Sequence, residues 1–124
     1  MRIKETVVVI DAADIDAVSA FWAALLNGRV WKDDEEGWHS VLVDDKQVIG
    51  VQRAPNHTPP EWPDGTQQQI HLDLYVDDMA AAHEEAIALG ARLLQETGDP
   101  EAVDGFAVYA DPAGHPFCLC WRRD

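Results

Sequence analysis

Three polar side chains alternate along one predicted strand, residues 69–76 of the string "QIHLDLYVDD". His71, Asp73 and Tyr75 are two residues apart, and side chains at that spacing lie on one face of a strand, about 7 Å from one another. An imidazole beside a carboxylate can act as a general base, so His71 and Asp73 are candidate catalytic residues. The same pair could be a surface ion pair of little energetic weight. The strand therefore forms either the floor of a ligand cavity or a solvated sheet surface.

Two cysteines, Cys118 and Cys120, lie two residues apart in another predicted strand, residues 115–122. Their side chains share a face but stand about 7 Å apart, which is too far for a disulfide between them. We therefore expect reduced thiols, as in a cytoplasmic protein. Each cysteine is expected either to be buried in the core as a small hydrophobic residue or to contact a ligand.

The composition limits the partners of the chain. It has 124 residues, of which 47% are hydrophobic, enough for one compact domain or two small packed modules. Nine basic against 23 acidic residues give a formal net charge of -14, which repels nucleic acid and anionic membrane surfaces. No segment approaches the about 20 consecutive apolar residues of a membrane span. We expect a cytoplasmic protein whose partner is a small molecule.

The elements that position these residues are expected in two similar sets. The first set is a strand at residues 5–10, a helix capped by Asp11 and Asp14 and ended by Asn27-Gly28, and strands at residues 29–32, 38–43 and 47–52. The second set is the strand at residues 69–76, a helix from Asp77 or Asp78 to Leu89 that Gly90 closes, and strands near residues 91–96, 105–110 and 115–122. A tight turn, "DPAG" at residues 111–114, separates the last two strands.

Between the two sets, residues 53–65 hold four prolines and a glycine and are predicted to be a linker. The helix-ending glycines, Gly28 and Gly90, lie 62 residues apart (90 - 28 = 62), which indicates an internal duplication. We place module one at about residues 1–53, the linker at about 54–67 and module two at about 68–124.

This order of elements, with its motifs, resembles the vicinal oxygen chelate superfamily, in particular its glyoxalase-like and bleomycin resistance-like members. The motifs are "DAADIDAVSAFWAALLNG" in the first module and "HLDLYVDD", "ALGA" and "DPAGHPFCLCW" in the second. The resemblance implies an α+β fold in which two tandem βαβββ modules form a curved mixed sheet, a cup, within a single domain of residues 1–124. It also implies a homodimer.

The resemblance further implies a divalent-metal site on the cup-facing positions of four strands. Matched by motif, its ligands would be His71, Gln52, Cys118 and, on the first strand, either Glu5 or Val7. An amide at Gln52 and a thiol at Cys118 lack the charge that a hard divalent ion prefers. A zinc site of His71, Cys118 and Cys120 is a softer alternative. No cofactor is therefore expected, and a divalent metal on His71, Gln52 and Glu5 is the alternative.

The ligand-binding residues expected in the cup are Trp38, Ser40, Gln52, Tyr75, Cys118 and Cys120. One hypothesis is an enzyme, a lyase, isomerase or dioxygenase, that uses His71 as metal ligand or base. Another is a non-enzymatic protein that sequesters a cationic drug or metabolite, because the acidic charge and five tryptophans favour a planar cation. A third is an interaction module, which would need an exposed apolar patch.

Overall fold

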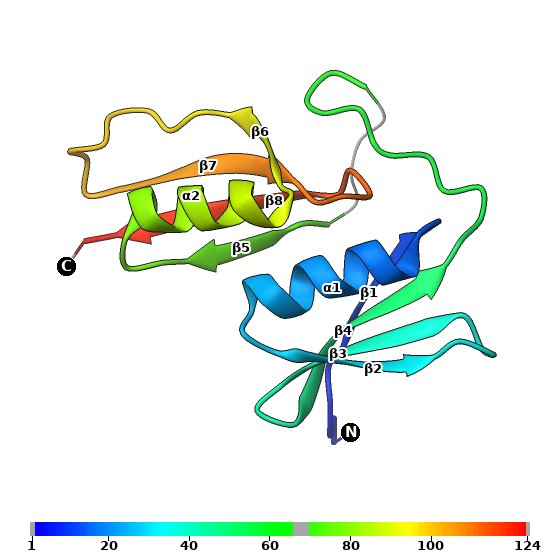
Figure 1. Ribbon diagram of the computed structural model, residues 1–124. Helices are drawn as coiled ribbons and strands as arrows, with labels where there is room; N and C mark the ends of the chain where they lie inside the picture. Colours follow the sequence, from blue (N-terminus) through cyan, green and yellow to red (C-terminus); the bar gives the residue numbers. More distant parts are fainter. Residues whose placement is uncertain (1, 66–69, 124) are drawn as a thin grey trace. The chain divides into compact units, whose positions relative to one another are not determined.

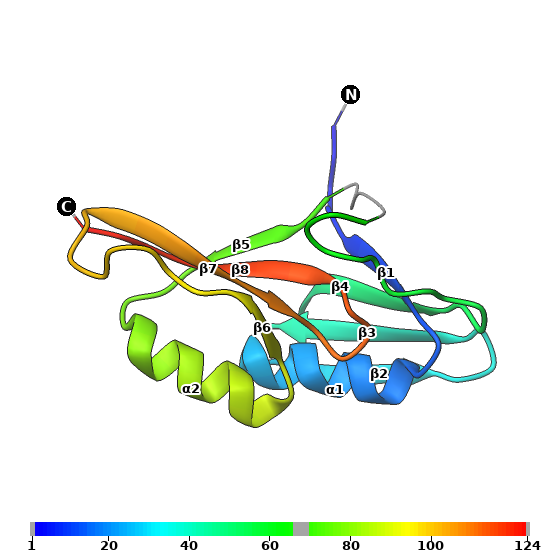
Figure 2. The ribbon, with the colours of Figure 1, turned by 90° about the horizontal axis from the view of Figure 1, so that it is seen from above.

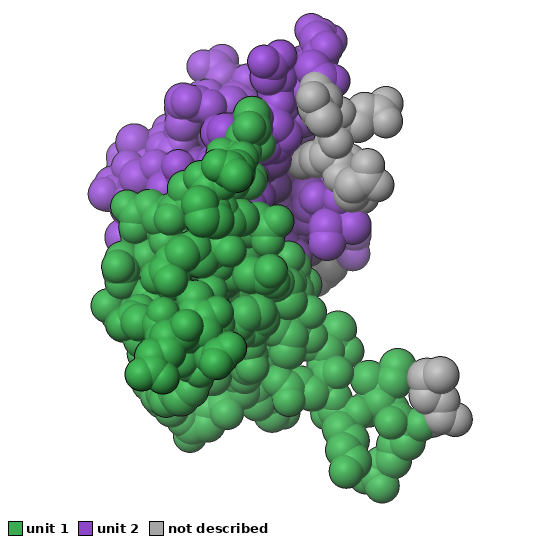
Figure 3. All heavy atoms as spheres, turned by 90° about the vertical axis from the view of Figure 1, so that its right-hand side faces the viewer, with its two compact units in different colours: residues 1–58 green, residues 59–124 purple. Residues whose placement is uncertain are grey.

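The chain divides into two compact units in the computed structural model, Met1–Thr58 and Pro59–Asp124, referred to below as unit 1 and unit 2 (Figure 3). The structure describes residues 2–65 and 70–123. Within these residues, no helix has the length and apolar character needed to cross a membrane.

The two units repeat one topology (Figure 1). The elements of unit 1 are β1 (Val8–Ala12), α1 (Ile15–Leu25), β2 (Arg29–Asp33), β3 (Trp38–Val43) and β4 (Lys46–Arg53). Those of unit 2 are β5 (Leu72–Tyr75), α2 (Met79–Leu89), β6 (Arg92–Gln95), β7 (Asp104–Ala110) and β8 (Pro116–Arg122). The strand orders are β1-β4-β3-β2 and β5-β8-β7-β6, and in each sheet the first strand runs parallel to the last while the others are antiparallel. The prediction of an α+β fold with two tandem βαβββ modules is confirmed.

Each helix begins at an aspartate, as the sequence predicts. The side chain of Asp14 accepts a hydrogen bond from the Ala17 amide at 3.0 Å, and that of Asp78 accepts one from the Ala81 amide at 3.1 Å. These bonds satisfy backbone donors that have no partner within the first turn of a helix. Asp11, the other predicted cap, lies instead within β1, so that part of the prediction is wrong.

The first helix also ends near the predicted position. Asn27 takes the left-handed conformation (φ 57°), and Gly28 donates its amide to the Ala23 carbonyl at 2.7 Å. A side chain at Gly28 would collide with the carbonyl oxygen of Leu42. Glycine is therefore required at residue 28 for space, while Asn27 supplies the unusual backbone angle.

The first strand was predicted too early in the chain. Residues 5–10 were expected, whereas β1 is Val8–Ala12, because its hydrogen bonds follow the end of β4, from Val8 opposite Ile49 to Ala12 opposite Arg53. Glu5 is exposed and precedes the strand, so its expected place on the first strand is wrong, while its role as a metal ligand stays a prediction. The β-branched run predicts a strand but contains no information about where its partner begins.

The strand of the polar triplet is shorter than predicted. β5 spans only Leu72–Tyr75, because its parallel pairing runs from Leu72 opposite Phe117 to Tyr75 opposite Cys120. His71 lies directly before β5. Gln69 of the predicted strand, together with residues 66 and 67 of the predicted linker, is outside the described residues.

Each helix covers one face of its own sheet (Figure 2). In unit 2 the covered face holds Tyr109 and Phe117, both fully buried, whose rings stack with centroids 5.6 Å apart. His83 of α2 bonds the Tyr109 hydroxyl at 2.8 Å. Because neighbours along a strand point to opposite faces, the alternate residues Asp73, Cys118 and Cys120 lie on the face away from α2.

The linker contributes to that second face. Trp62 packs against the buried cluster of Val108, Cys118 and Cys120. The predicted linker is thus irregular in structure, as its prolines require, and also provides an indole that partly covers the two thiols.

Candidate functional site

The face of the second sheet away from α2 forms the floor of a cavity of about 640 Å³. Strands β5, β6, β7 and β8 all contribute to it, together with the loop between β6 and β7. The polar and aromatic residues that line it include His71, Asp73, Tyr75, Asp99, Asp104, Phe106 and Arg122. All of these residues belong to unit 2.

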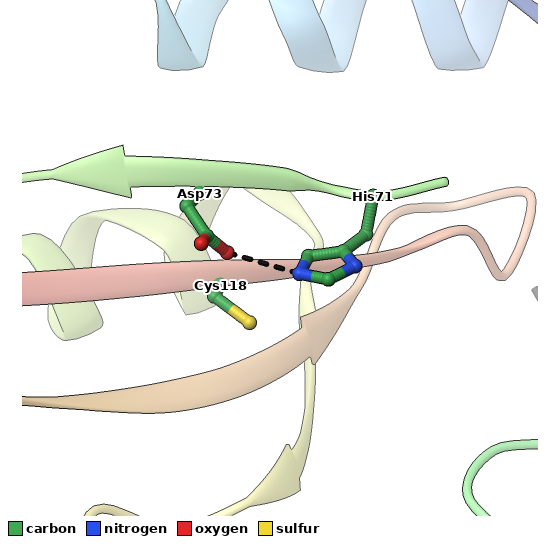
Figure 4. A group of neighbouring side chains, drawn as sticks. All are labelled: His71, Asp73 and Cys118. Atoms are coloured by element: carbon green, nitrogen blue, oxygen red, sulfur yellow. Dashed lines mark ion pairs between the residues drawn. The ribbon is translucent and has the colours of Figure 1, made fainter. Parts of the chain in front are cut away.

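Three side chains with different chemistry meet in this cavity (Figure 4). Nε2 of His71 lies 3.1 Å from Oδ1 of Asp73, and the ligand atoms of His71, Asp73 and Cys118 lie within 4.8 Å of one another. Asp73 and Cys118 are brought together because they are directly opposite in the parallel pairing of β5 with β8. The side chains of His71 and Asp73 are 43% and 48% exposed, so a ligand can reach them.

The thiols beside this pair are held in the neutral form. Burial raises the pKa of Cys118 to about 12, together with the neighbouring Asp73 carboxylate, which accepts a hydrogen bond from the Cys118 thiol. Burial also raises the pKa of Cys120. Because the thiolate is the nucleophilic form of cysteine, neither residue is suited to nucleophilic catalysis at neutral pH.

Arg122, the one arginine among the described residues that line the cavity, is engaged by an aromatic ring. The Arg122 guanidinium lies 4.8 Å from the centroid of the Tyr75 ring and donates a hydrogen bond to the Tyr75 hydroxyl at 3.1 Å. Three carboxylates, those of Asp73, Asp99 and Asp104, line the same cavity. The local charge is therefore negative, which favours a cationic ligand.

Two exposed aromatic rings flank the cysteine pair. Tyr75 and Phe106 are each opposite Cys120, on the strands to either side of it, and they are 59% and 48% exposed. Two strand spacings separate their backbones, about 10 Å. Aromatic rings in contact have centroids about 4.5–7 Å apart, so both rings are in reach of a planar ligand bound over Cys120.

The predicted site residues fall into two groups, one in each unit. His71, Asp73, Tyr75, Cys118 and Cys120 line the cavity of unit 2. Trp38, Ser40 and Gln52 lie on β3 and β4 of unit 1, so a cavity shared by both groups stays a prediction. The Trp38 indole donates to the Ser40 hydroxyl at 2.9 Å and lies against Gly50. Its contacts are those of a packed side chain.

Four residues that line the cavity are not among those predicted from the sequence: Phe106, Asp99, Asp104 and Arg122. Arg122 lies two residues after Cys120 and four after Cys118 on the same strand, so the alternation of side chains places it on the same face. The sequence pattern therefore indicates this residue. Phe106 and Asp104 alternate with the buried Ala107 along β7 in the same way. Asp99 lies in a loop, for which strand parity gives no prediction.

The group of His71, Asp73 and Cys118 does not fit a tightly held hard divalent ion. Asp73 is the one carboxylate of the His71, Asp73 and Cys118 group, and it already interacts with both of the other side chains. The Cys118 thiol would first have to lose its proton, which its raised pKa opposes. A hard divalent ion needs several anionic oxygen ligands to offset its loss of water. These three side chains by themselves therefore do not form a tight site for a hard divalent ion.

The fold and the match of a family model define the class of protein. The model of the glyoxalase-like domain matches residues 7–120, and the chain belongs to this family. The resemblance seen in the sequence is confirmed. No functionally curated protein matches the chain.

Solved structures share its fold at low sequence identity. One is the fosfomycin resistance protein FosX from Listeria monocytogenes, with 14% identity and a TM-score of 0.73, over 98% of this chain and 94% of that one. Another is a glyoxalase/bleomycin resistance protein/dioxygenase family enzyme from Burkholderia phytofirmans PsJN, with 20% identity and a TM-score of 0.69, over 93% and 95%. A glyoxalase/bleomycin resistance protein/dioxygenase from Alicyclobacillus acidocaldarius has 11% identity and a TM-score of 0.66, over 98% and 92%.

Proposed function

We propose that the protein binds a small organic cation with a planar ring in the cavity of unit 2 and holds it without chemical change. The observation that carries this proposal is the joint lining of one cavity by three carboxylates and two exposed aromatic rings, those of Tyr75 and Phe106. Cations are attracted both to carboxylates and to the faces of aromatic rings. Arg122, whose guanidinium lies over the Tyr75 ring, offsets only one of the three carboxylates, so the lining stays negative.

Proton transfer to or from a bound substrate is a second candidate function. It is favoured by the 3.1 Å contact between His71 and Asp73. A carboxylate that accepts from one imidazole nitrogen orients the ring and stabilises the charged imidazolium formed during general base catalysis. A lyase or isomerase would use the pair in this way, whereas a sequestering protein would use it only to attract the cation.

Two planar probes of opposite charge test the first proposal. 1-Methylquinolinium and 2-naphthalenesulfonate have fused rings of similar size, and isothermal titration calorimetry measures the affinity of each for the full chain. We expect the cation to bind at least about tenfold more tightly than the anion, because three carboxylates face the ligand. Asp73→Asn should weaken binding of the cation by about tenfold, because it removes one of the three carboxylates of the lining.

The matched control is Glu85→Gln, which removes an exposed carboxylate of α2 and should leave the affinity for 1-methylquinolinium unchanged. Equal affinity for the two probes, or no effect of Asp73→Asn, would contradict the proposal. Mass spectrometry of the recovered cation checks the first proposal, because sequestration returns the probe unchanged.

A cytoplasmic homodimer is also part of this proposal. Val9 and Trp31, on the two edge strands of the first sheet, are 46% and 54% exposed, and pairing with a second copy would cover apolar side chains of this kind. Both cysteines are reduced, which suits the cytoplasm. Light scattering at micromolar concentration should give twice the chain mass of 13.8 kDa. The mass of a single chain would reject the dimer.

A further inference from the structure

A fully buried histidine links α1 to the turn between β2 and β3 in unit 1. The side chain of His39 is 0% exposed. Its Nδ1 lies 2.8 Å from Oγ of Ser19 on α1, and its Nε2 lies 2.8 Å from Oδ1 of Asp34. Oδ1 of Asp16 is 3.9 Å from the same Nε2. The imidazole is thus fully enclosed, and its Nε2 lies against two carboxylates whose own side chains are exposed.

This serine, histidine and aspartate are not a hydrolytic triad. Ser19 is only 1% exposed, so its hydroxyl cannot meet a substrate. The solvent-accessible end of the chain is formed instead by Asp16 and Asp34, whose side chains are each 68% exposed. Whatever this group binds must contact the carboxylates and Nε2.

The hydrogen bonds of Ser19 prepare Nε2 to act as a ligand. The Ser19 hydroxyl can donate to the main-chain oxygen of Asp16 at 3.4 Å, and its oxygen can then accept the proton of His39 Nδ1. In the 2.8 Å bond to Asp34 the carboxylate can only accept, so Nε2 carries a proton there; in the tautomer with Nδ1 protonated, a cation between the two carboxylates would take the place of that proton. Histidine ligands of metals commonly donate their second ring nitrogen to an oxygen in this way.

We propose that Asp16, Asp34 and His39 form a binding site for a divalent transition-metal ion such as zinc, built entirely from unit 1. Their ligand atoms lie within 4.8 Å of one another. Ligands about 2.0–2.2 Å from zinc lie roughly 2.9–3.6 Å from one another, so only a small movement of Asp16 closes the site. Two carboxylates neutralise the charge of the ion, which the single carboxylate of the His71, Asp73 and Cys118 group does not.

Lys32 competes with the metal for one ligand. Its Nζ lies 3.0 Å from Oδ1 of Asp16, the same oxygen that is nearest to His39. An ion at the site must displace this ammonium, and the two positive charges repel each other. Removing Lys32 should therefore increase the affinity for the metal, whereas a purely structural ion-pair network predicts no metal binding with or without Lys32.

Zinc chloride is titrated into the full chain carrying His71→Ala and Cys118→Ala, which remove two ligands of the unit 2 group. Calorimetry should show one equivalent bound. In this background Asp34→Asn should weaken binding by at least about tenfold, and Lys32→Met should tighten it by about three- to tenfold. Asp45→Asn is the matched control, because it removes an 88% exposed carboxylate that is paired with Arg29, and it should change nothing.

A cobalt(II) titration of the unmodified chain assigns the site independently. Binding at Asp16, Asp34 and His39 shifts the His39 ring signals in NMR spectra and gives no thiolate-to-cobalt absorption band, because sulfur is absent from the site. No binding of zinc, wild-type affinity in Asp34→Asn, or weaker binding in Lys32→Met would each overturn the proposal. These two variants change exposed side chains, so they test it even if His39→Ala fails to fold.

Discussion

Phe117→Ala is expected to lower the free energy of unfolding by about 3–5 kcal/mol. Phe117 is fully buried between α2 and the second sheet, and its ring stacks on Tyr109 with an interplanar angle of 23°. Truncation removes buried apolar area and leaves a cavity that rigid neighbours cannot fill. Denaturant-induced unfolding, followed by tryptophan fluorescence, measures the change.

The control for this prediction is Phe106→Ala on the opposite face of the same sheet. Phe106 is 48% exposed, so its loss should cost about 1 kcal/mol or less while weakening the binding of 1-methylquinolinium. The comparison tests the assignment of the two faces directly. If Phe106→Ala were the more destabilising variant, the assignment of the two faces would be wrong, and the face of Phe106 would be the core face of the sheet.

Alkylation of Cys118 at neutral pH is expected to be about a thousandfold slower than that of a free cysteine. The pKa of this thiol is raised from its ordinary value of 9.0 to about 12, and each unit lowers the thiolate fraction about tenfold. The rate is measured with iodoacetamide and mass spectrometry in a Cys120→Ser variant. Asp73→Asn should increase it, because burial and the carboxylate of Asp73 together cause the shift.

The same raised pKa predicts a loss of stability at high pH. Between about pH 9 and pH 12 the unfolded chain has lost the Cys118 proton while the folded chain retains it, so stability falls as the pH rises. Below pH 9 the contribution is fully present. Cys118→Ala should make this part of the pH profile shallower. A thiol that reacts as fast as free cysteine would instead indicate a thiolate, and would reopen the case for metal binding or nucleophilic chemistry in this cavity.

The sequence by itself determined the elements and most of their faces. The aspartates before each helix, Gly90 after the second helix and the alternation of His71, Asp73 and Tyr75 are local signals, and each acts within a few residues of its own position. Strand parity alone placed Asp73 and Tyr75 away from the apolar core. The start of β1 was missed because a strand begins where its partner offers hydrogen bonds, and that partner, β4, lies about 40 residues further along the chain.

Only the tertiary structure decided which of these side chains meet. The parallel pairing of β5 with β8 joins Asp73 to Cys118, and it also brings Tyr75 and Phe106 to either side of Cys120. Packing of α1 on the first sheet brings Ser19 to His39, and a turn brings Asp34 to the same ring. Parity along a strand gives the face of a residue, whereas its neighbours depend on the register between distant strands and on the position of the helix. The cavity and the proposed metal site therefore follow from the pairing of segments far apart in the sequence.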